Sequence, residues 1–274
     1  MNHFEILKHY GIRAQKSLGQ NFLVNDGILE HIAGSIEITG KDIVEIGPGY
    51  GALTEKILAK KPHSLTLIEL DKKMVSILES RILEGDLIIP EETVFTIVSA
   101  DVLKYVPESW PYSVIANIPY YITSPILFRF LHDLEHKPDE MVILMQKEVG
   151  DKICMKKWYK HSYLSLALEF SCETIREICL VEKENFIPSP KVDSNVLYFK
   201  RKNSYDSVGA RNFLRITSAG FSSPRKKLLS NLAHTLHISK EILSGFFLQL
   251  WLLETVRAEE ISIDIWRKLI VLMK

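Results

Sequence analysis

The chain has 274 residues, of which 46% are hydrophobic and 25% are charged, and its formal net charge is zero. This composition is ordinary for a globular protein that folds in water, and the length suffices for one large domain and one small one. No apolar run approaches the roughly 18 residues of a membrane-spanning helix, and the first residues lack a basic segment followed by an apolar one. We therefore exclude a membrane protein and expect a cytoplasmic one.

Cysteine content argues against a disulfide framework and against a metal centre. Cys154, Cys172 and Cys179 are odd in number, and their positions lack the paired spacing of zinc ligands. We predict buried thiols and no metal site.

Charge is unevenly distributed along the chain. Residues 1–190 carry 20 basic and 27 acidic side chains, whereas residues 191–274 carry 14 basic and 7 acidic ones. A C-terminal excess of +7 favours a polyanionic partner, although such an excess also occurs on surfaces that only face water.

The predicted elements begin with an arm and continue as alternating strands and helices. Residues 9–23 are polar and basic with two glycines, which predicts an extended arm, and Asn25 or Asp26 then caps a helix. Helical faces follow at about 52–61, 74–82 and 123–134. Strands are predicted between and after them, at 43–46, 64–68, 94–98, 113–116, 141–145, 173–181 and 195–199.

This alternation predicts an α/β fold, a Rossmann-like and mostly parallel sheet with helices on both faces, whose ligands bind at the carboxyl ends of the strands. Beyond Lys200-Arg201-Lys202 the pattern is helical only, with helices predicted at 207–220, 223–235, 239–248 and 262–273. We therefore predict an α/β domain over residues 1–203, with its arm at about 1–24, and a small all-helical domain over residues 204–274.

The turn after the first of these strands carries the pattern of a nucleotide-like ligand site. Residues 44–54 join a buried strand to a helix through Gly47, Gly49 and Gly51, and glycines let a backbone pass close to a ligand. Gly47, Gly49 and Ala52 fit a dinucleotide fingerprint, whereas Glu45 followed by the three glycines fits the turn of S-adenosylmethionine (SAM) enzymes. A turn that merely ends a strand is the third possibility.

Acidic residues follow the next two strands. Glu69 lies 22 positions beyond Gly47 at a strand end, where open α/β folds place the acid that accepts hydrogen bonds from ribose hydroxyls. We prefer it to Asp71, which looks like a helix cap. Asp101 could accept a bond from an adenine amino group with Val102 packed on the ring, or it could simply cap a turn.

The segment Asn117-Ile118-Pro119-Tyr120 ends the fourth strand and offers acceptors for an exocyclic amine. The Asn117 oxygen and the carbonyl of Ile118 or Pro119 could bind the two N–H bonds more tightly as the nitrogen becomes cationic during methylation. Tyr120 could stack on a flipped base, and Phe186 could close its other face. The alternatives are a strand-ending turn for this segment and a core aromatic for Phe186.

Together these motifs resemble the family of small-subunit ribosomal RNA adenine dimethyltransferases. The resemblance runs from about residue 10 to the end of the chain, and the residues that carry it are Gln20–Leu23, Glu45–Gly51, Ile68–Asp71, Asn117–Tyr120, Phe186–Ser194 and the basic segment Phe221–Leu228. Tyr50, Tyr121 and Pro224 depart from the family, which commonly has Leu, Asn and Arg there. The last departure puts one RNA contact in doubt.

The resemblance implies a SAM-dependent enzyme that dimethylates the N6 amino groups of two adjacent adenosines near the 3′ end of small-subunit rRNA. Its partner would be that RNA or a pre-30S particle, with a role in small-subunit biogenesis, and we expect a monomer without a metal. The implied cofactor contacts are Asn21, Leu23, Gly47, Glu69, Asp101 and Asn117, joined in our interpretation by Glu45, Gly49 and Val102. We expect RNA contacts from Arg13, Lys16, Lys191, Arg225, Lys226 and Lys227.

Three other functions compete with this interpretation. A related enzyme could methylate large-subunit rRNA and confer antibiotic resistance. A nicotinamide-dependent oxidoreductase could use the same glycine turn, but no proton donor is paired with a hydride site. An rRNA-binding assembly factor could have only secondary catalysis.

Overall fold

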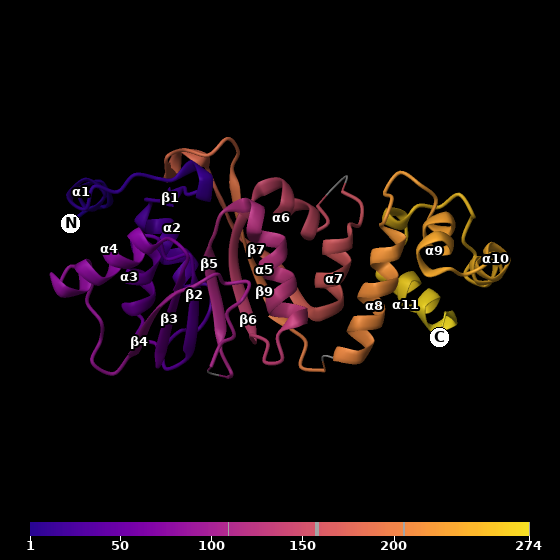
Figure 1. The fold of residues 1–274 in the computed structure, drawn as a ribbon, viewed down its shortest axis with the longest axis horizontal. Helices are drawn as coiled ribbons and strands as arrows, with labels where there is room; N and C mark the ends of the chain where they lie inside the picture. The colour runs from indigo at the N-terminus through magenta and orange to yellow at the C-terminus, as the bar shows by residue number, and fades with distance from the viewer. Residues whose placement is uncertain (109, 157–158, 205, 274) are drawn as a thin grey trace. The chain divides into compact units, whose positions relative to one another are not determined.

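The structure, a computed structural model, describes residues 1–108, 110–156, 159–204 and 206–273 (Figure 1). The chain forms two compact units: the first contains residues 1–150 and 174–201, and the second contains residues 151–173 and 202–274. The α/β domain predicted over residues 1–203 includes residues 151–173. In the structure they belong with the C-terminal helices, so the second unit is built from two separate segments.

The first unit is built on a seven-stranded sheet in the order β4-β3-β2-β5-β6-β9-β7. Five neighbouring strands are parallel, and β9 runs antiparallel to β6. This topology confirms the predicted Rossmann-like α/β class. The strands are β2 (Asp42–Ile46), β3 (Ser64–Glu69), β4 (Val94–Ser99), β5 (Ser113–Asn117), β6 (Glu140–Gln146), β7 (Cys172–Val181) and β9 (Ser194–Arg201).

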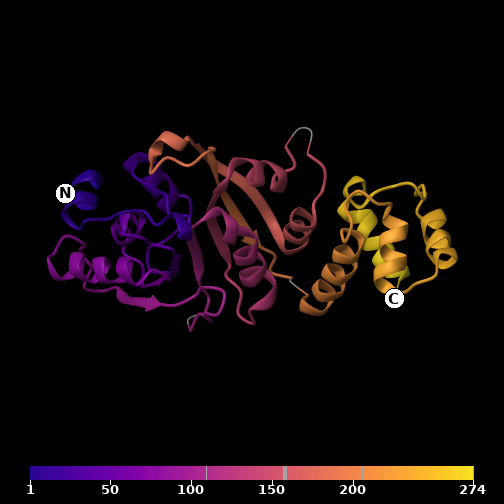
Figure 2. The ribbon, with the colours of Figure 1, turned by 45° about the horizontal axis from the view of Figure 1, so that its top comes forward.

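Helices cover both faces of this sheet. In Figures 1 and 2, α2 (Asp26–Ala33), α3 (Ala52–Leu58) and α4 (Lys72–Leu83) lie on one face, and α5 (Thr123–Phe128) lies on the other. Asn25 caps α2 and Asp71 caps α4, as predicted. The predicted helix 123–134 changes at Arg129–Asp133 to a π-helical turn. The core between the layers is apolar, with Leu29, Ile57, Leu65, Leu67 and Leu78 buried in one cluster.

The N-terminal segment is more ordered than the predicted extended arm. It begins with α1 (His3–His9), whose first turn is closed by a capping box of Asn2 and Glu5. A 3₁₀ turn at Lys16–Leu18 and the short strand β1 (Phe22–Leu23) follow. β1 pairs antiparallel with β8 (Phe186–Ile187), a contact between distant segments that local sequence does not encode.

The second unit is helical and packs around the fully buried Trp266. Its helices are α7 (Tyr163–Ser171), α8 (Ser207–Gly220), α9 (Leu228–Leu236), α10 (Lys240–Gln249) and α11 (Ile263–Leu272), and α6 (Lys147–Ile153) precedes α7 at the division between the units. The four predicted C-terminal helices are present, but α9 starts at Leu228 instead of 223, because residues 223–227 form a turn and an extended cap. α6 and α7 escaped prediction, although Ser162 caps α7.

In the described chain no disulfide joins the three cysteines. Cys172 is buried as predicted, while Cys154 and Cys179 are only half-buried. None of the helices in the described ranges combines the length and apolar character needed to cross a membrane.

Candidate active site

A pocket of about 1080 Å³, its open mouth included, lies in the first unit at the carboxyl ends of the parallel strands. Strand ends in parallel sheets are the usual place for ligands in such folds. Every residue predicted to touch a cofactor or a base lines this pocket, namely Asn21, Leu23, Glu45, Gly47, Gly49, Glu69, Asp101, Val102, Asn117, Pro119, Tyr120 and Phe186.

The glycine turn has the backbone that its sequence predicts. Gly47, Gly49 and Gly51 have φ angles of +68°, +58° and +91°. A Cβ on Gly49 would lie 3.1 Å from the Phe22 ring, and one on Gly51 would lie 2.8 Å from a methyl carbon of Leu78. The turn therefore needs glycine for conformation and for space.

The two buried glutamates at the strand ends have different partners. Glu69 accepts hydrogen bonds from the main-chain N–H groups of Gly49 (3.1 Å) and Asp71 (2.8 Å), and its burial raises its pKa. Glu45 accepts a hydrogen bond from the Thr54 hydroxyl at 2.7 Å, and burial raises the pKa of Glu45 to about 8. Glu69 thus has two backbone donors that stabilise its charged form, whereas burial favours the protonated form of Glu45.

Asp101 caps a turn, and its predicted contact with adenine stays a prediction. One carboxylate oxygen accepts the Leu103 N–H at 3.0 Å, which makes Asp101 the cap of a turn. The residue is half-buried and also lines the pocket, next to the buried Val102.

The acceptor segment follows β5 directly. Asn117 is half-buried at the end of the strand, and its side-chain amide makes no hydrogen bond to the part of the chain that the structure describes. The Tyr120 hydroxyl lies 2.8 Å from the Ser194 hydroxyl of β9, which fixes the position of the ring. Phe186 is buried in the core cluster, as one of its two interpretations predicts, and it also lines the pocket.

The arm contributes more to the pocket than the sequence indicates. Leu18, Gly19 and Gln20 join the lining, and a Cβ on Gly19 would lie 3.2 Å from the side chain of Pro119. The side-chain amides of Gln15 and Gln20 both donate to one oxygen of Asp71, each at 2.9 Å. The two glutamines carry no local signal of this role, although Gln20 directly precedes the predicted contact Asn21.

The predicted RNA contacts whose side chains the structure describes do not line the pocket. Arg13 and Lys191 are exposed on the first unit, and Arg225, Lys226 and Lys227 are exposed before α9 in the second. The side chain of Lys16 lies outside what the structure describes. Across the described residues, no three His, Cys, Asp or Glu side chains gather in a way that could hold a metal ion.

Sheet order, glycine turn and strand-end acids together define the class of Rossmann-like α/β folds with a nucleotide-type ligand site at the strand ends. A protein-family model described as ribosomal RNA adenine dimethylase matches residues 11–268. The chain belongs to the ribosomal RNA adenine dimethylase family.

Curated relatives agree with this assignment over most of their length. The chain is 37% identical over 238 residues to "Ribosomal RNA small subunit methyltransferase A" of Listeria innocua, covering 84% of this chain and 79% of the relative. It is 34% identical to the protein of that name from Dehalococcoides mccartyi, over 97% of this chain and 90% of the relative. It is 35% identical to the one from Bacillus cytotoxicus, over 95% of this chain and 91% of the relative.

Two solved structures share the fold. The 23S rRNA methyltransferase ErmE superposes with a TM-score of 0.69 at 20% identity, covering 92% of this chain and 99% of that one. A dimethyladenosine transferase from Plasmodium falciparum also superposes with a TM-score of 0.69, at 23% identity, covering 89% of this chain and 94% of that one.

Proposed function

We propose that the chain transfers methyl groups from SAM to the N6 amino groups of two adjacent adenosines near the 3′ end of small-subunit rRNA, forming N6,N6-dimethyladenosine. In this proposal the first unit binds SAM and catalyses, and the basic second unit binds RNA. The observation that carries it is the meeting, in one pocket, of the glycine turn, the strand-end acid Glu69 and the acceptor segment that begins at Asn117. Family membership supports the same chemistry.

The residues of the pocket fit SAM. Glu69 has two carboxylate oxygens with more acceptor positions than the two backbone N–H groups fill, so ribose hydroxyls can also donate to it. Asp101 and Val102 can hold the adenine ring, and Asn21, Leu23, Glu45, Gly47 and Gly49 can complete the enclosure. When bound, SAM supplies a methyl group on a positively charged sulfur.

The acceptor segment would orient the target amine. The Pro119 carbonyl already accepts the Ile122 N–H at 3.2 Å, which favours the Ile118 carbonyl as the second acceptor beside the Asn117 oxygen. Both acceptors bind an amine more strongly as it gains positive charge, so they stabilise the transition state more than the ground state. Tyr120, fixed through Ser194, and Phe186 can hold the base between them.

A strong general base is not needed. The amine that has accepted a methyl group is cationic and acidic, so it can release its proton to water. Because water can take this proton, hydrogen-bond acceptors and aromatic rings suffice for the proposed chemistry of the pocket.

The relatives favour the small subunit over the large one as the source of the substrate. Those at 34–37% identity are named small-subunit methyltransferases, whereas the likeness to ErmE is one of fold alone. We place the reaction in the cytoplasm, on RNA or a pre-30S particle, with the enzyme acting as a monomer and without a metal.

The test is methyl transfer from labelled SAM to undermethylated small ribosomal subunits, with large subunits beside them and mass spectrometry of the digested RNA. We expect dimethyladenosine in small-subunit RNA, loss of product in Asn117→Ala, and normal product in Asn212→Ala, an asparagine of α8 that does not line the pocket. Label in large-subunit RNA alone would replace the proposal with the resistance-type activity, and no label in either would refute it. If Asn117→Ala still associates with small subunits, binding is separable from catalysis.

A further inference from the structure

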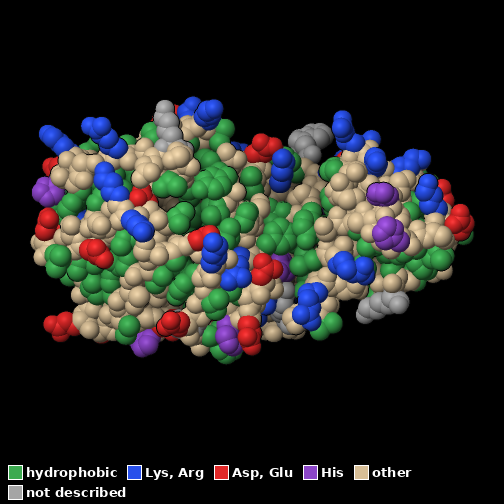
Figure 3. All heavy atoms as spheres, in the orientation of Figure 1, with side chains coloured by type: hydrophobic (Ala, Val, Ile, Leu, Met, Phe, Trp, Pro, Cys, Tyr) green, Lys and Arg blue, Asp and Glu red, His purple; other side chains and the backbone are tan. Residues whose placement is uncertain are grey.

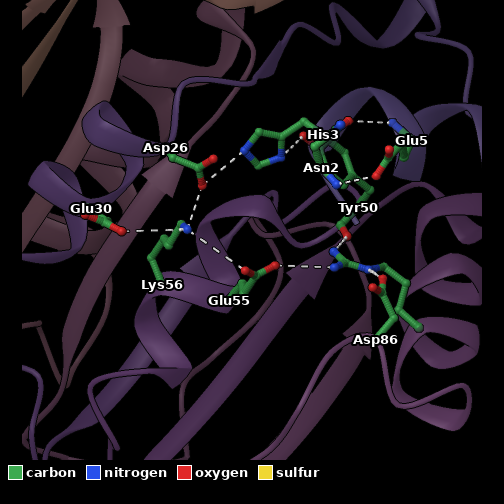
Figure 4. A network of polar contacts seen from close by, with 10 residues as sticks. Asn2, His3, Glu5, Asp26, Glu30, Tyr50, Glu55, Lys56 and Asp86 are labelled. Carbon is green, nitrogen blue, oxygen red and sulfur yellow. Dashed lines mark hydrogen bonds and ion pairs between the residues drawn. The ribbon is translucent and has the colours of Figure 1, made fainter.

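Tyr50 stands at the centre of the glycine turn, yet its side chain points away from solvent and is only 1% exposed. Its hydroxyl oxygen lies 3.0 Å from Nδ1 of His3, in the first turn of α1 (Figure 4). The two rings meet edge to face, with centroids 6.0 Å apart. A residue 47 positions earlier in the chain therefore contacts the turn directly.

The main chain of Tyr50 is held by a residue of another element. Arg81, fully buried on α4, donates from Nη1 to the Tyr50 carbonyl oxygen at 2.7 Å and from Nε to Asp86 at 2.6 Å. Because both the hydroxyl and the carbonyl of Tyr50 have partners on other elements, the residue is fixed at two points.

The second nitrogen of His3 faces Asp26. Nε2 lies 3.4 Å from the Asp26 carboxylate, an electrostatic contact whose geometry falls short of a hydrogen bond. Asp26 is bonded in turn to Lys56 at 2.6 Å (Figure 4). A proton on Nε2 is favoured by this carboxylate, which leaves Nδ1 to accept the Tyr50 O–H.

Tyr50 is also coupled to the pocket itself. The Phe22 ring packs edge to face on Tyr50 with centroids 5.4 Å apart, and a Cβ on Gly49 would lie only 3.1 Å from the same ring. The Gly49 N–H is the group that donates to Glu69. The contacts thus run continuously from His3 through Tyr50 to the proposed ribose acceptor.

We propose that His3 and Tyr50 are positioning residues of the cofactor site, whose imidazole–hydroxyl bond holds the glycine turn in the conformation in which Gly49 meets Glu69. The inference rests on the proposed function in that it takes SAM as the ligand. Helix α1 thereby gains a role in cofactor binding. Tyr50 supplies the hydroxyl for this contact, at a position where the family commonly has a leucine.

The experiment compares two tyrosines that anchor the same helix. Tyr50→Phe removes the hydroxyl that contacts His3. Tyr10→Phe removes the hydroxyl that donates to Glu84 at 2.9 Å and ties the other end of α1 to the residue after α4, without touching the turn. SAM binding to the full chain is measured by calorimetry, beside KM and kcat for methyl transfer and the melting temperature.

We expect Tyr50→Phe to weaken SAM binding about five- to tenfold, as loss of one buried hydrogen bond would, with a matching rise in KM for SAM and an unchanged kcat. Tyr10→Phe should bind SAM like the parent chain. His3→Ala should weaken binding as much as Tyr50→Phe, the double variant should lose little more than either, and His3→Asn, which restores an acceptor, should regain affinity.

Two results would overturn the inference while leaving the proposed function intact. One is wild-type SAM affinity in Tyr50→Phe. The other is an equal loss in Tyr10→Phe, which would mean that docking of α1 in general, and not the contact with the turn, controls binding. Failure of the unmodified chain to bind SAM would instead refute the proposed function, and this inference with it.

Discussion

Single carboxyl groups decide much of the chemistry of the pocket, as Glu45 illustrates. Its burial raises its pKa to about 8 from an ordinary 4.5. The folded chain therefore keeps a proton that the unfolded chain has released between these two pH values. Because the folded state then binds more protons, its stability falls as the pH rises through this range.

We predict that Glu45→Gln flattens this decline. The amide cannot ionise and still offers an oxygen to the Thr54 hydroxyl. Denaturant unfolding at pH 5 and pH 8 should give the variant a smaller loss of stability than the parent, while Glu79→Gln, an exposed site on α4, should keep the parental dependence. An unaltered pH dependence in Glu45→Gln would show that burial does not hold the proton.

Glu69 supports a second prediction at the same scale. Glu69→Ala should weaken SAM binding by about 1.5 to 3 kcal/mol, the range for hydrogen bonds to a charged group. Glu69→Gln keeps one acceptor oxygen and should therefore lose less SAM affinity than Glu69→Ala. Unchanged affinity of the alanine variant in a calorimetric titration would remove Glu69 from the ribose site.

At the scale of elements, the arm depends on the start of α4. Asp71 caps this helix by accepting the Lys73 N–H at 2.9 Å, and its other oxygen accepts from Gln15 and Gln20. One side chain therefore stabilises a helix and holds the arm beside the pocket.

We predict that Asp71→Ala destabilises the fold by about 1 to 2 kcal/mol through the lost cap, and also loosens the arm. Trypsin should cut faster at the exposed Arg13. Asp206→Ala is the matched control, because Asp206 caps α8 of the second unit through the Val208 N–H at 3.0 Å, whereas the arm belongs to the first unit. Equal cleavage rates in the two variants would mean that the arm is held by other contacts.

At the scale of the whole molecule, the excess of basic side chains lies mainly in the unit proposed to bind RNA and not in the unit proposed to bind SAM. Residues 191–274 carry twice as many basic as acidic side chains, 14 against 7, and most of this stretch belongs to the helical unit. Lys and Arg side chains are spread over the face of that unit drawn at the right of Figure 3. Such a surface attracts RNA through its phosphates and makes binding sensitive to salt.

We predict that reversing the charges of Arg225, Lys226 and Lys227 weakens RNA association and leaves SAM affinity unchanged. The slope of the logarithm of the RNA association constant against the logarithm of the salt concentration should become shallower by up to about two to three. Reversal of Arg211, Arg215 and Lys268, which are also exposed in the second unit, changes the net charge equally and serves as the control. An unaltered salt slope would place the RNA surface elsewhere, on the arm with Arg13 and Lys16. Equal effects in both triple variants would point to the overall field of the unit.

Sequence patterns alone predict the seven strands of the main sheet, the helices α2–α5 and α8–α11, and a set of cofactor and base contacts that all line the pocket. Hydrophobic periodicity marked the strands, Asn25 and Asp71 marked helix starts, and parallel topology brought strand-end residues as distant as Glu45 and Asn117 to one edge of the sheet. These features depend on residues close together in the chain or on a general rule of sheet topology, so they can be predicted from the sequence.

Contacts between segments far apart in the sequence depend on tertiary packing. The pairing of β1 with β8, the contacts of Gln15 and Gln20 with Asp71, the bond between His3 and Tyr50 and the transfer of residues 151–173 to the helical unit all join segments far apart in sequence. Each depends on side chains that meet after the core has packed. No local propensity specifies such a meeting, because its free energy comes from burial and complementarity in the folded chain.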